Sequence, residues 1–424
     1  MKSNPKRTAL TGAFPLLVIL LIVAHVFGQE SVRDSSDKTS RSSRPGYRFA
    51  SGTSALGIPF ELSSNFVLVQ ARVNKSRPLW FIFSTASTSI IDLGTAKQLG
   101  LPVEGNIKPS STGGGAEMRL IHGISLELPG VTTLNQRVAT LPLNFLSSIL
   151  GQPIAGIIGY DFVRQFVVDL NYGTRKINVY AAPTFRYSGS GEVLPLKFIE
   201  QAPFVGVKIT MEGQDTVAGT FELETADTGV LQVERSFTEA HQLVKSAKGF
   251  RLGNAGGSEE GLTRTLQGRV RNITLGRYEI NNPIVSFLQA DAGKDAQANG
   301  DGQLGGEVLR RFRLILDYTR QRIIIEPNQH LTEAVEADMS GIELVAEGED
   351  LRALTINEVV PNSPASEAGL KEEDEVTIIN GQRVSDLSLE QIRQSLKQEG
   401  QEVALTFKRG TQTLQAKLRL RRLI

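Results

Sequence analysis

Two short segments of this sequence place hydroxyl and acid side chains directly after a buried strand, where they could do chemistry. The apolar run 79–83 and the run 220–223 each end in a triplet. The triplets are Ser84, Thr85 and Ala86 in the first segment, and Glu224, Thr225 and Ala226 in the second. A carboxylate can act as a general base on water, whereas a hydroxyl carries no ionisable group near neutral pH. The two triplets therefore supply one acid between them.

A second repeat fixes the alignment of the two segments. Residues 156–180 align without a gap on residues 302–326, and glycines, an Arg, a Phe, a Leu, a Tyr and an Ile coincide. Two matching landmarks at near-constant separation indicate an internal duplication. Two similar halves that face each other usually form a site at their junction, so we expect the triplets to meet there.

A strand, a triplet and a turn, followed by an apolar-apolar-Gly segment and present twice, resemble the retropepsin-like aspartic proteases of bacteria. The resemblance covers residues 60–327 and implies a mainly β, two-lobed acid-protease fold. In that family each half supplies Asp-Thr-Gly, and the two aspartates share one proton: one activates water while the other polarises the scissile carbonyl. Here Ser84 and Glu224 stand at the Asp positions, and Ala86 and Ala226 at the Gly positions.

These replacements argue against catalysis. Ser84 can neither hold the shared proton nor raise the pKa of its partner by like-charge repulsion. Glu224 could act as a lone base, but its longer side chain displaces the oxygens by about 1 Å, which can cost about 100-fold in rate. Each Ala adds a methyl group where Gly lets the backbone approach substrate closely. We expect a catalytically impaired, peptide-binding relative of the proteases, with an active endopeptidase as the alternative.

A literal Asp-Thr-Gly follows directly, beginning at Asp227. If Asp227 were the catalytic acid, Glu224 would lie inside a buried strand and the apolar pair 230–231 would come three residues too early. The register with Glu224 is therefore preferred, and Asp227 is the alternative acid. A nucleophilic Ser84 would need a His or Lys base, and none of the four His residues has a spacing that suggests one. No paired His/Asp spacing indicates a metal site, and no cofactor is expected.

After residue 327 the pattern changes, and residues 338–424 resemble a bacterial-type PDZ domain, which combines helices with a β-barrel-like sheet. The matching motifs are SPA at 363–365, AGL at 368–370 and IING at 378–381, whereas EED at 372–374 lacks the Gly that the family usually has before its Asp. PDZ domains bind an extended peptide by strand addition and hold its terminal carboxylate on loop N–H groups. The resemblance places that loop at Met339, Ser340, Gly341 and Ile342, and the facing helix surface at Leu389, Ile392 and Leu396. The same three helix residues could instead form the core of the domain.

The N-terminal sequence predicts export. Basic residues precede an apolar segment at 16–27, and Gly28 suits a cleavage site. Because that segment is short for a membrane-spanning helix, which needs about 20 residues, a cleaved signal peptide is preferred over a membrane anchor. The protein is then periplasmic or secreted. The expected organisation is a signal peptide at 1–28, a flexible leader at 29–59, a first lobe at 60–185, a second lobe at 186–330 and the PDZ domain at 338–424.

Composition limits the possible partners. With 46 basic and 45 acidic side chains, the formal net charge of +1 gives no reason to expect nucleic acid as a partner. The absence of Cys excludes disulfides, thiol catalysis and a lipid anchor attached through Cys. The expected partners are peptides or the C-termini of unfolded proteins. Because a duplicated chain completes its own cleft, we expect a monomer.

Overall fold

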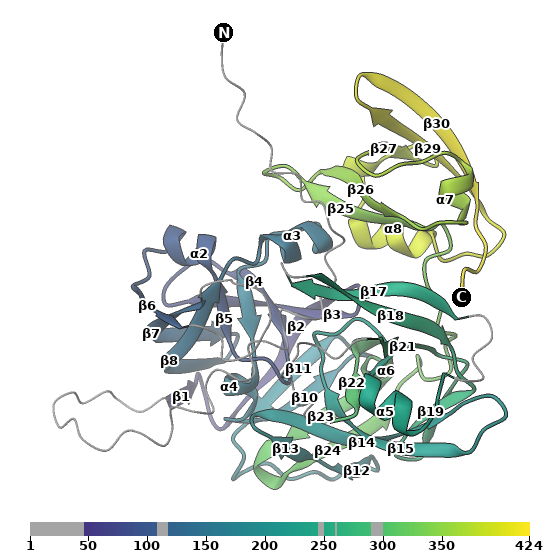
Figure 1. The fold of residues 1–424 in the computed structure, drawn as a ribbon. Coiled ribbons are helices and arrows are strands. Elements are labelled where there is room, and N and C mark those ends of the chain that lie inside the picture. The colour runs from purple at the N-terminus through teal and green to yellow at the C-terminus, as the bar shows by residue number, and fades with distance from the viewer. Residues whose placement is uncertain (1–45, 108–117, 245–249, 259–260, 290–299) are drawn as a thin grey trace.

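The computed structural model describes residues 46–107, 118–244, 250–258, 261–289 and 300–424 (Figure 1). The predicted signal peptide and most of the predicted leader lie outside the described residues. Within the described ranges, no helix combines the length and the apolar character that a membrane crossing requires. Two β-rich lobes lie side by side and the smaller C-terminal domain lies against them (Figure 1). The two-lobed, mainly β fold and the C-terminal domain predicted from the sequence are confirmed.

The described part of the first lobe consists of strands of 3 to 11 residues and three brief helices. In chain order its elements are β1 (Gly46–Phe49), β2 (Ser54–Ser63), β3 (Phe66–Val73), β4 (Leu79–Phe83), β5 (Ile90–Asp92), α2 (Leu93–Gln98), β6 (Val103–Ile107), β7 (Met118–Leu128), β8 (Val131–Leu141), α3 (Asn144–Leu150), β9 (Gly156–Ile158), α4 (Tyr160–Val163), β10 (Val167–Asn171) and β11 (Lys176–Tyr180).

The fold begins earlier than the sequence analysis predicted. β1 pairs with β8, with Gly46 opposite Leu134, and β2 already runs from Ser54. The prediction of a flexible leader up to residue 59 is therefore wrong for residues 46–49 and 54–59. The polar composition of the preceding residues 30–45 was extended too far along the chain, since β2 already buries Ala55 and Ile58.

The second lobe repeats this order. Its elements are β12 (Glu192–Pro195), β13 (Lys197–Ile199), β14 (Ala202–Thr210), β15 (Thr216–Leu223), β16 (Leu231–Val233), α5 (Arg235–Ala240), β17 (Arg251–Ser258), β18 (Gly261–Arg269), β19 (Asn272–Leu275), β20 (Tyr278–Asn281), β21 (Ile284–Leu288), β22 (Gly302–Leu304), α6 (Gly306–Leu309), β23 (Phe312–Asp317), η2 (Tyr318–Arg320) and β24 (Arg322–Pro327).

Strand pairing shows the duplication directly. In the first lobe β9 lies between β4, to which it is parallel, and β5, to which it is antiparallel. In the second lobe β22 lies in the same way between β15 and β16. The lobes are joined where β10 pairs with β23, so that one sheet runs β12-β24-β23-β10-β11-β2 across both halves. Each triplet thus leaves the end of a central strand at the interface between the lobes.

The glycine that follows β9, Gly159, and the one that follows β22, Gly305, let the backbone pass close to the triplet turns. A Cβ at Gly159 would lie 2.0 Å from the carbonyl oxygen of Ser87, and a Cβ at Gly305 would lie 2.4 Å from that of Gly229. No other residue can occupy these two positions without moving the turn that follows each triplet. The repeated glycines seen in the sequence therefore have one shared steric cause.

The C-terminal domain has its own hydrophobic core. Its elements are β25 (Ile342–Glu347), β26 (Ala353–Val359), α7 (Pro364–Glu367), β27 (Glu375–Ile379), β28 (Gln382–Arg383), η3 (Val384–Asp386), α8 (Leu389–Ser395), β29 (Glu402–Arg409) and β30 (Gln412–Arg419). The sheet order is β25-β26-β27-β29-β30, so β25 is an edge strand. Residues 372–374 form the turn that the PDZ fold requires although they lack the usual Gly, because Glu373 adopts a left-handed φ of 68°.

Candidate functional site

The two triplets meet where the lobes join. The hydroxyl of Ser84 lies 2.8 Å from Oε1 and 3.0 Å from Oε2 of Glu224, and it donates its proton to this carboxylate. The backbone N–H of Ala226 donates to Oε1 of Glu224 at 2.7 Å, and the hydroxyl of Ser87 lies 3.3 Å from Oε2. The N–H groups of Ala86 and Ser87 donate to the oxygen of Ser84. Each triplet thus uses its own backbone to hold its first side chain toward the other lobe.

The two threonines hold the lobes together reciprocally. Thr85 Oγ1 donates to the carbonyl of Leu223 at 2.5 Å, and Thr225 Oγ1 donates to the carbonyl of Phe83 at 2.8 Å. Each threonine thus reaches the residue before the opposite triplet. The hydroxyl of Tyr318 donates to the carbonyl of Thr85 at 2.9 Å. These buried bonds relate the two halves by an approximate twofold axis that passes between the triplets.

Burial changes the acidity of the carboxyl groups in this region. Burial raises the pKa of Glu224 to about 7, although the N–H of Ala226 and the hydroxyl of Ser84 oppose it by donating to the carboxylate. Burial also raises the pKa of Asp227 to about 6, and that of Glu222 to about 8, where the charge of Glu224 adds to the effect. Glu224 therefore keeps its proton to a higher pH than an exposed carboxyl group does.

The site is closed. The six side chains of the triplets are only 0–2% exposed. The methyl group of Ala86 lies in an apolar cluster with Ala202 and Phe204, and that of Ala226 lies in a cluster that includes Phe66. The methyl groups that replace the family's glycines therefore fill the core between the lobes, on the two sides of the Ser84–Glu224 pair.

Asp227 lies in the turn that follows the second triplet. Its Oδ1 accepts from the N–H of Gly229 at 2.8 Å, and its carbonyl accepts from Gly306. The threonine that reaches across to the first lobe is Thr225, and the side chain that faces Ser84 is that of Glu224. Glu224 therefore occupies the position opposite Ser84, and Asp227 forms part of the turn that follows the second triplet.

Ser84 has no base of the kind that a serine nucleophile needs. Its hydroxyl contacts the carboxylate of Glu224 and two backbone N–H groups, and among the described residues no His or Lys hydrogen-bonds to it. His330 bonds to Glu333, and His241 packs on the ring of Phe237. A carboxylate next to a serine hydroxyl, without an imidazole or amine between them, leaves the hydroxyl a weak nucleophile.

A second candidate site is the cavity of about 500 Å³ between the C-terminal domain and the lobes. The loop residues Gly341 and Ile342 line it, together with Leu396 at the end of α8. The polar face of α8 and its continuation also line it, through Glu390, Arg393, Gln394 and Lys397. The lobes contribute Ser64, Asn65, Thr228, Arg251 and Gln267.

The predicted apolar peptide-binding face of α8 is wrong for Leu389 and Ile392. Both are buried in the core of the C-terminal domain, and neither lines the cavity. Leu389 also packs near Gly151, at the end of α3. Met339, predicted to bind peptide, is likewise a core residue. A helix face that packs into the core and a helix face that binds a ligand show the same 3.6-residue spacing of apolar residues, so the sequence could not separate them. In α8 the apolar face packs into the core, and the neighbouring polar face lines the cavity.

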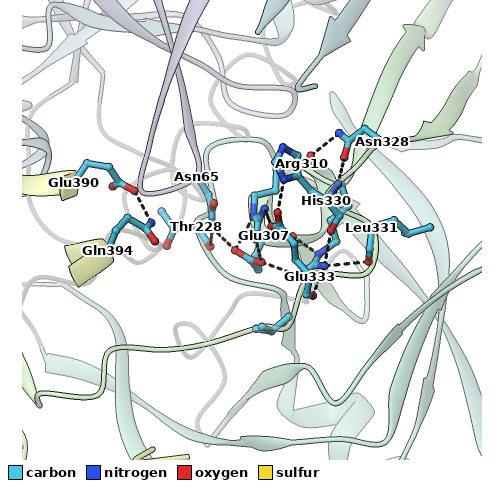
Figure 2. Close-up of polar contacts among 12 residues, drawn as sticks. Asn65, Thr228, Glu307, Arg310, Asn328, His330, Leu331, Glu333, Glu390 and Gln394 are labelled. Atoms are coloured by element: carbon cyan, nitrogen blue, oxygen red, sulfur yellow. Dashed lines mark hydrogen bonds and ion pairs between the residues drawn. The ribbon is translucent and has the colours of Figure 1, made fainter. Parts of the chain in front are cut away.

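A tight turn connects the cavity to the triplets. The N–H and hydroxyl of Ser64 donate to Glu390 at 2.7 and 3.0 Å, and Arg393 donates to the Ser64 hydroxyl. The next residue, Asn65, donates from Nδ2 to the carbonyl of Thr228 at 2.8 Å and to Glu307 at 2.9 Å (Figure 2). One turn of the first lobe therefore touches both the helix of the C-terminal domain and the segment just after the second triplet.

The chain segment that leads to the C-terminal domain is held by Arg311. Its guanidinium is fully buried, pairs with Glu307 at 2.8 Å, and donates to the carbonyls of His330, Leu331 and Glu333. Figure 2 shows Glu307 within this cluster, with Asn65 and Arg310 bonded to its carboxylate. The sequence motifs did not predict this cluster, although two consecutive arginines inside the second copy of the repeat are a signal that could have pointed to it.

Comparison with known proteins agrees with this division of the chain. Residues 69–162 match the family model described as "Aspartyl protease", and residues 332–408 match that described as "PDZ domain". The resemblances inferred from the motifs are confirmed. The probable CtpA-like serine protease of Staphylococcus haemolyticus (strain JCSC1435) is 26% identical over 160 residues, which is 38% of this chain. This chain thus spans only 30% of the length of that relative. The photosystem II D1 C-terminal processing protease shares 20% identity over 20% of this chain and 23% of its own, with a TM-score of 0.19.

Proposed function

We propose that this chain, an aspartyl protease-like two-lobed body joined to a PDZ domain, binds peptide segments without cutting them. The observation that carries the proposal is the pair at the centre of the lobes, where Ser84 faces Glu224. The two-acid mechanism requires two carboxylates that share one proton, so that one stays charged while the other donates. With a hydroxyl on one side, the pair has one acid and no second proton donor of the required acidity.

The same pair is well suited to a structural role. A hydroxyl that donates into a buried carboxylate, together with the two threonine bonds, links the lobes without needing water. An attacking water would have to enter between groups that are at most 2% exposed. In this proposal the lobes act as a rigid body, and the PDZ domain supplies the peptide-binding surface.

The site of action is proposed to be outside the cytoplasm, on the strength of the basic and apolar segment at the N-terminus. Unfolded or extended polypeptides are the proposed ligands, because a strand added at the β25 edge is bound through the hydrogen-bonding groups of its main chain, which a folded surface does not expose. The duplicated lobes need no second chain, so the proposed state is monomeric.

One observation favours a second candidate function, an endopeptidase that uses Glu224 as a lone base. A carboxyl group with a pKa of about 7 is poised for proton transfer near neutral pH. This activity would require the lobes to part enough to admit water and substrate.

Cleavage and binding of unfolded casein distinguish the two functions. The full chain is incubated with fluorescent casein from about pH 3 to about pH 8, with and without pepstatin, beside the variants Glu224→Gln and Asp227→Asn. We expect binding, seen as a rise in fluorescence anisotropy, and no release of fragments. Cleavage that pepstatin inhibits and that Glu224→Gln abolishes would overturn the proposal in favour of the endopeptidase. Cleavage lost only in Asp227→Asn would assign the acid to the alternative residue.

A further inference from the structure

The loop that should receive a peptide's terminal carboxylate already holds a carboxylate of its own. The N–H groups of Ser340 and Gly341 donate to Oδ1 of Asp338 at 2.9 and 2.7 Å. The hydroxyl of Ser340 donates to the same oxygen at 2.7 Å, and it accepts from the N–H of Ile342 at 3.2 Å. The N–H groups of Ser340, Gly341 and Ile342 therefore all donate to acceptors within residues 338–340.

These are the donors that a terminal carboxylate needs. A PDZ domain captures a free C-terminus because backbone N–H groups at the end of its groove are left open for an anion. Here Asp338 satisfies them with the same chemical group, in the wall of the cavity. A ligand carboxylate would have to displace the bonds of Asp338 and would then lie beside a second negative charge, which like-charge repulsion disfavours.

The rest of the groove offers backbone groups to an extended chain at the end of β25 nearest the loop, whereas α3 of the first lobe packs on β25 and its end lies beside Ala346 and Leu389. β25 is an edge strand, and the carbonyl of Leu344, in its middle, accepts from the guanidinium of Arg393 at 3.0 Å. An incoming strand can replace that donor with its own N–H group, so the exchange leaves the carbonyl satisfied. Beyond the groove the cavity continues to Ser64, Asn65 and Thr228 of the lobes. An internal segment that continues past the loop would run along these lobe residues and along Leu423 and Ile424, which also line the cavity, and it needs no terminus at the loop.

We propose that the groove between β25 and α8 recognises an internal, extended segment of a polypeptide and not a free C-terminus, with Asp338 standing where a ligand's terminal carboxylate would bind. This inference rests on the proposed function, since it requires the groove to bind peptide.

The test compares one peptide pool in two chemical forms. Fluorescein-labelled random peptides of a single length are made as free acids and as C-terminal amides, and their binding to the full chain is followed by fluorescence anisotropy. Wild-type protein should bind the two forms with Kd values equal to within about twofold. Asp338→Ala frees the loop N–H groups and should bind the free acids at least about tenfold more tightly than the amides. Asp338→Asn keeps an acceptor oxygen and should resemble the wild type.

Each outcome decides between the possibilities. A wild-type preference of about tenfold or more for free acids would overturn the inference and leave the proposed function intact. Equal binding in the wild type, with no preference gained in a folded Asp338→Ala variant, would also overturn the inference. Free-acid binding gained only in Asp338→Ala, when the wild type binds neither form, would support the role of Asp338 and count against the proposed function. No binding by any of the proteins would overturn both. Thermal melting of each variant confirms folding, and the wild-type comparison needs no variant.

Discussion

Replacement of Glu224 by Gln should make the protein more stable at alkaline pH and leave it unchanged near pH 4.5. Burial raises the pKa of Glu224 to about 7 in the folded state from an ordinary value of 4.5. Between these two pH values the folded protein binds a proton that the unfolded chain releases, so stability falls as pH rises through this window. At about 1.4 kcal/mol per pKa unit, the difference between 7 and 4.5 corresponds to a loss of about 3 kcal/mol, constant above pH 7.

Glutamine mimics the protonated side chain and carries no charge to bury. Its amide oxygen can accept from the N–H of Ala226, and its amide nitrogen can donate to the hydroxyl of Ser87, which lies 3.3 Å from Oε2 of Glu224. The variant should therefore keep its contacts while it loses the part of the pH dependence that Glu224 causes. Glu222 and Asp227 titrate in both proteins, but the charge of Glu224 also raises the pKa of Glu222. The difference between the two proteins therefore reports the titration of Glu224 together with its coupling to Glu222.

The assay is urea unfolding followed by the fluorescence of Trp80. This is the single Trp of the chain, and it lies in β4, four residues before Ser84. Glu224→Gln should match the wild type near pH 4.5 and exceed its free energy of unfolding by about 3 kcal/mol near pH 8. The exposed Glu61, in β2, provides the matched control, and Glu61→Gln should follow the wild type at every pH.

Two results would refute this reasoning. If the difference between wild type and Glu224→Gln were the same at both pH values, Glu224 would not be a buried acid whose proton is retained on folding. If the variant were less stable near pH 8, the charged form of Glu224 would be the one that the surrounding donors stabilise, and the opposite sign would hold.

Three further predictions use the same unfolding assay or thermal melting. Ser84→Ala removes the hydroxyl that donates to Glu224, so it should destabilise the protein by about 1–3 kcal/mol and raise the pKa of Glu224 further. The loss of stability above pH 4.5 should then continue to a higher pH than in the wild type, because Glu224 stays protonated longer in the folded state. An unchanged profile would count against the pairing. Asn65→Gly should lower the free energy of unfolding by about 1 kcal/mol, because Gly lacks the two side-chain hydrogen bonds of Asn65 but adopts its φ of 69° without strain. Asn65→Asp should lower it more, because its carboxylate would face that of Glu307. Equal losses in the two variants would show that charge at this turn is unimportant. Glu373→Gly should stabilise the PDZ domain by about 1 kcal/mol, because Gly adopts the left-handed backbone conformation of this residue without strain. The measurement is the melting temperature, which should rise. A lower melting temperature would contradict this account of the turn.

Much of the fold was readable from local pattern. The gapless repeat of residues 156–180 at 302–326 predicted the duplication, because glycines at Gly159 and Gly305 are enforced by close approach of backbone in both halves. The apolar strand that ends in a polar triplet predicted Ser84 and Glu224 as facing positions, and their oxygens lie 2.8 Å apart. Both signals are carried by residue type and spacing along the chain, so no tertiary information was needed to find them.

What the sequence could not reveal depends on contacts between segments far apart in the chain. The periodicity of α8 marked Leu389 and Ile392 as one apolar face, but only packing decided that this face is the core and that the polar face carrying Arg393 lines the cavity. No sequence motif at Ser64 and Asn65 predicts the contact between Ser64 and Glu390, which is 326 residues away in the chain.

The sequence by itself determined the architecture and the missing second acid, because hydrophobic period, steric demands on glycine and residue chemistry are local properties. Only the tertiary structure decided how acidic Glu224 is, that the triplets are closed to solvent and that the loop N–H groups are turned onto Asp338. These properties arise from burial and from the direction of N–H groups, and both exist only once the chain has folded.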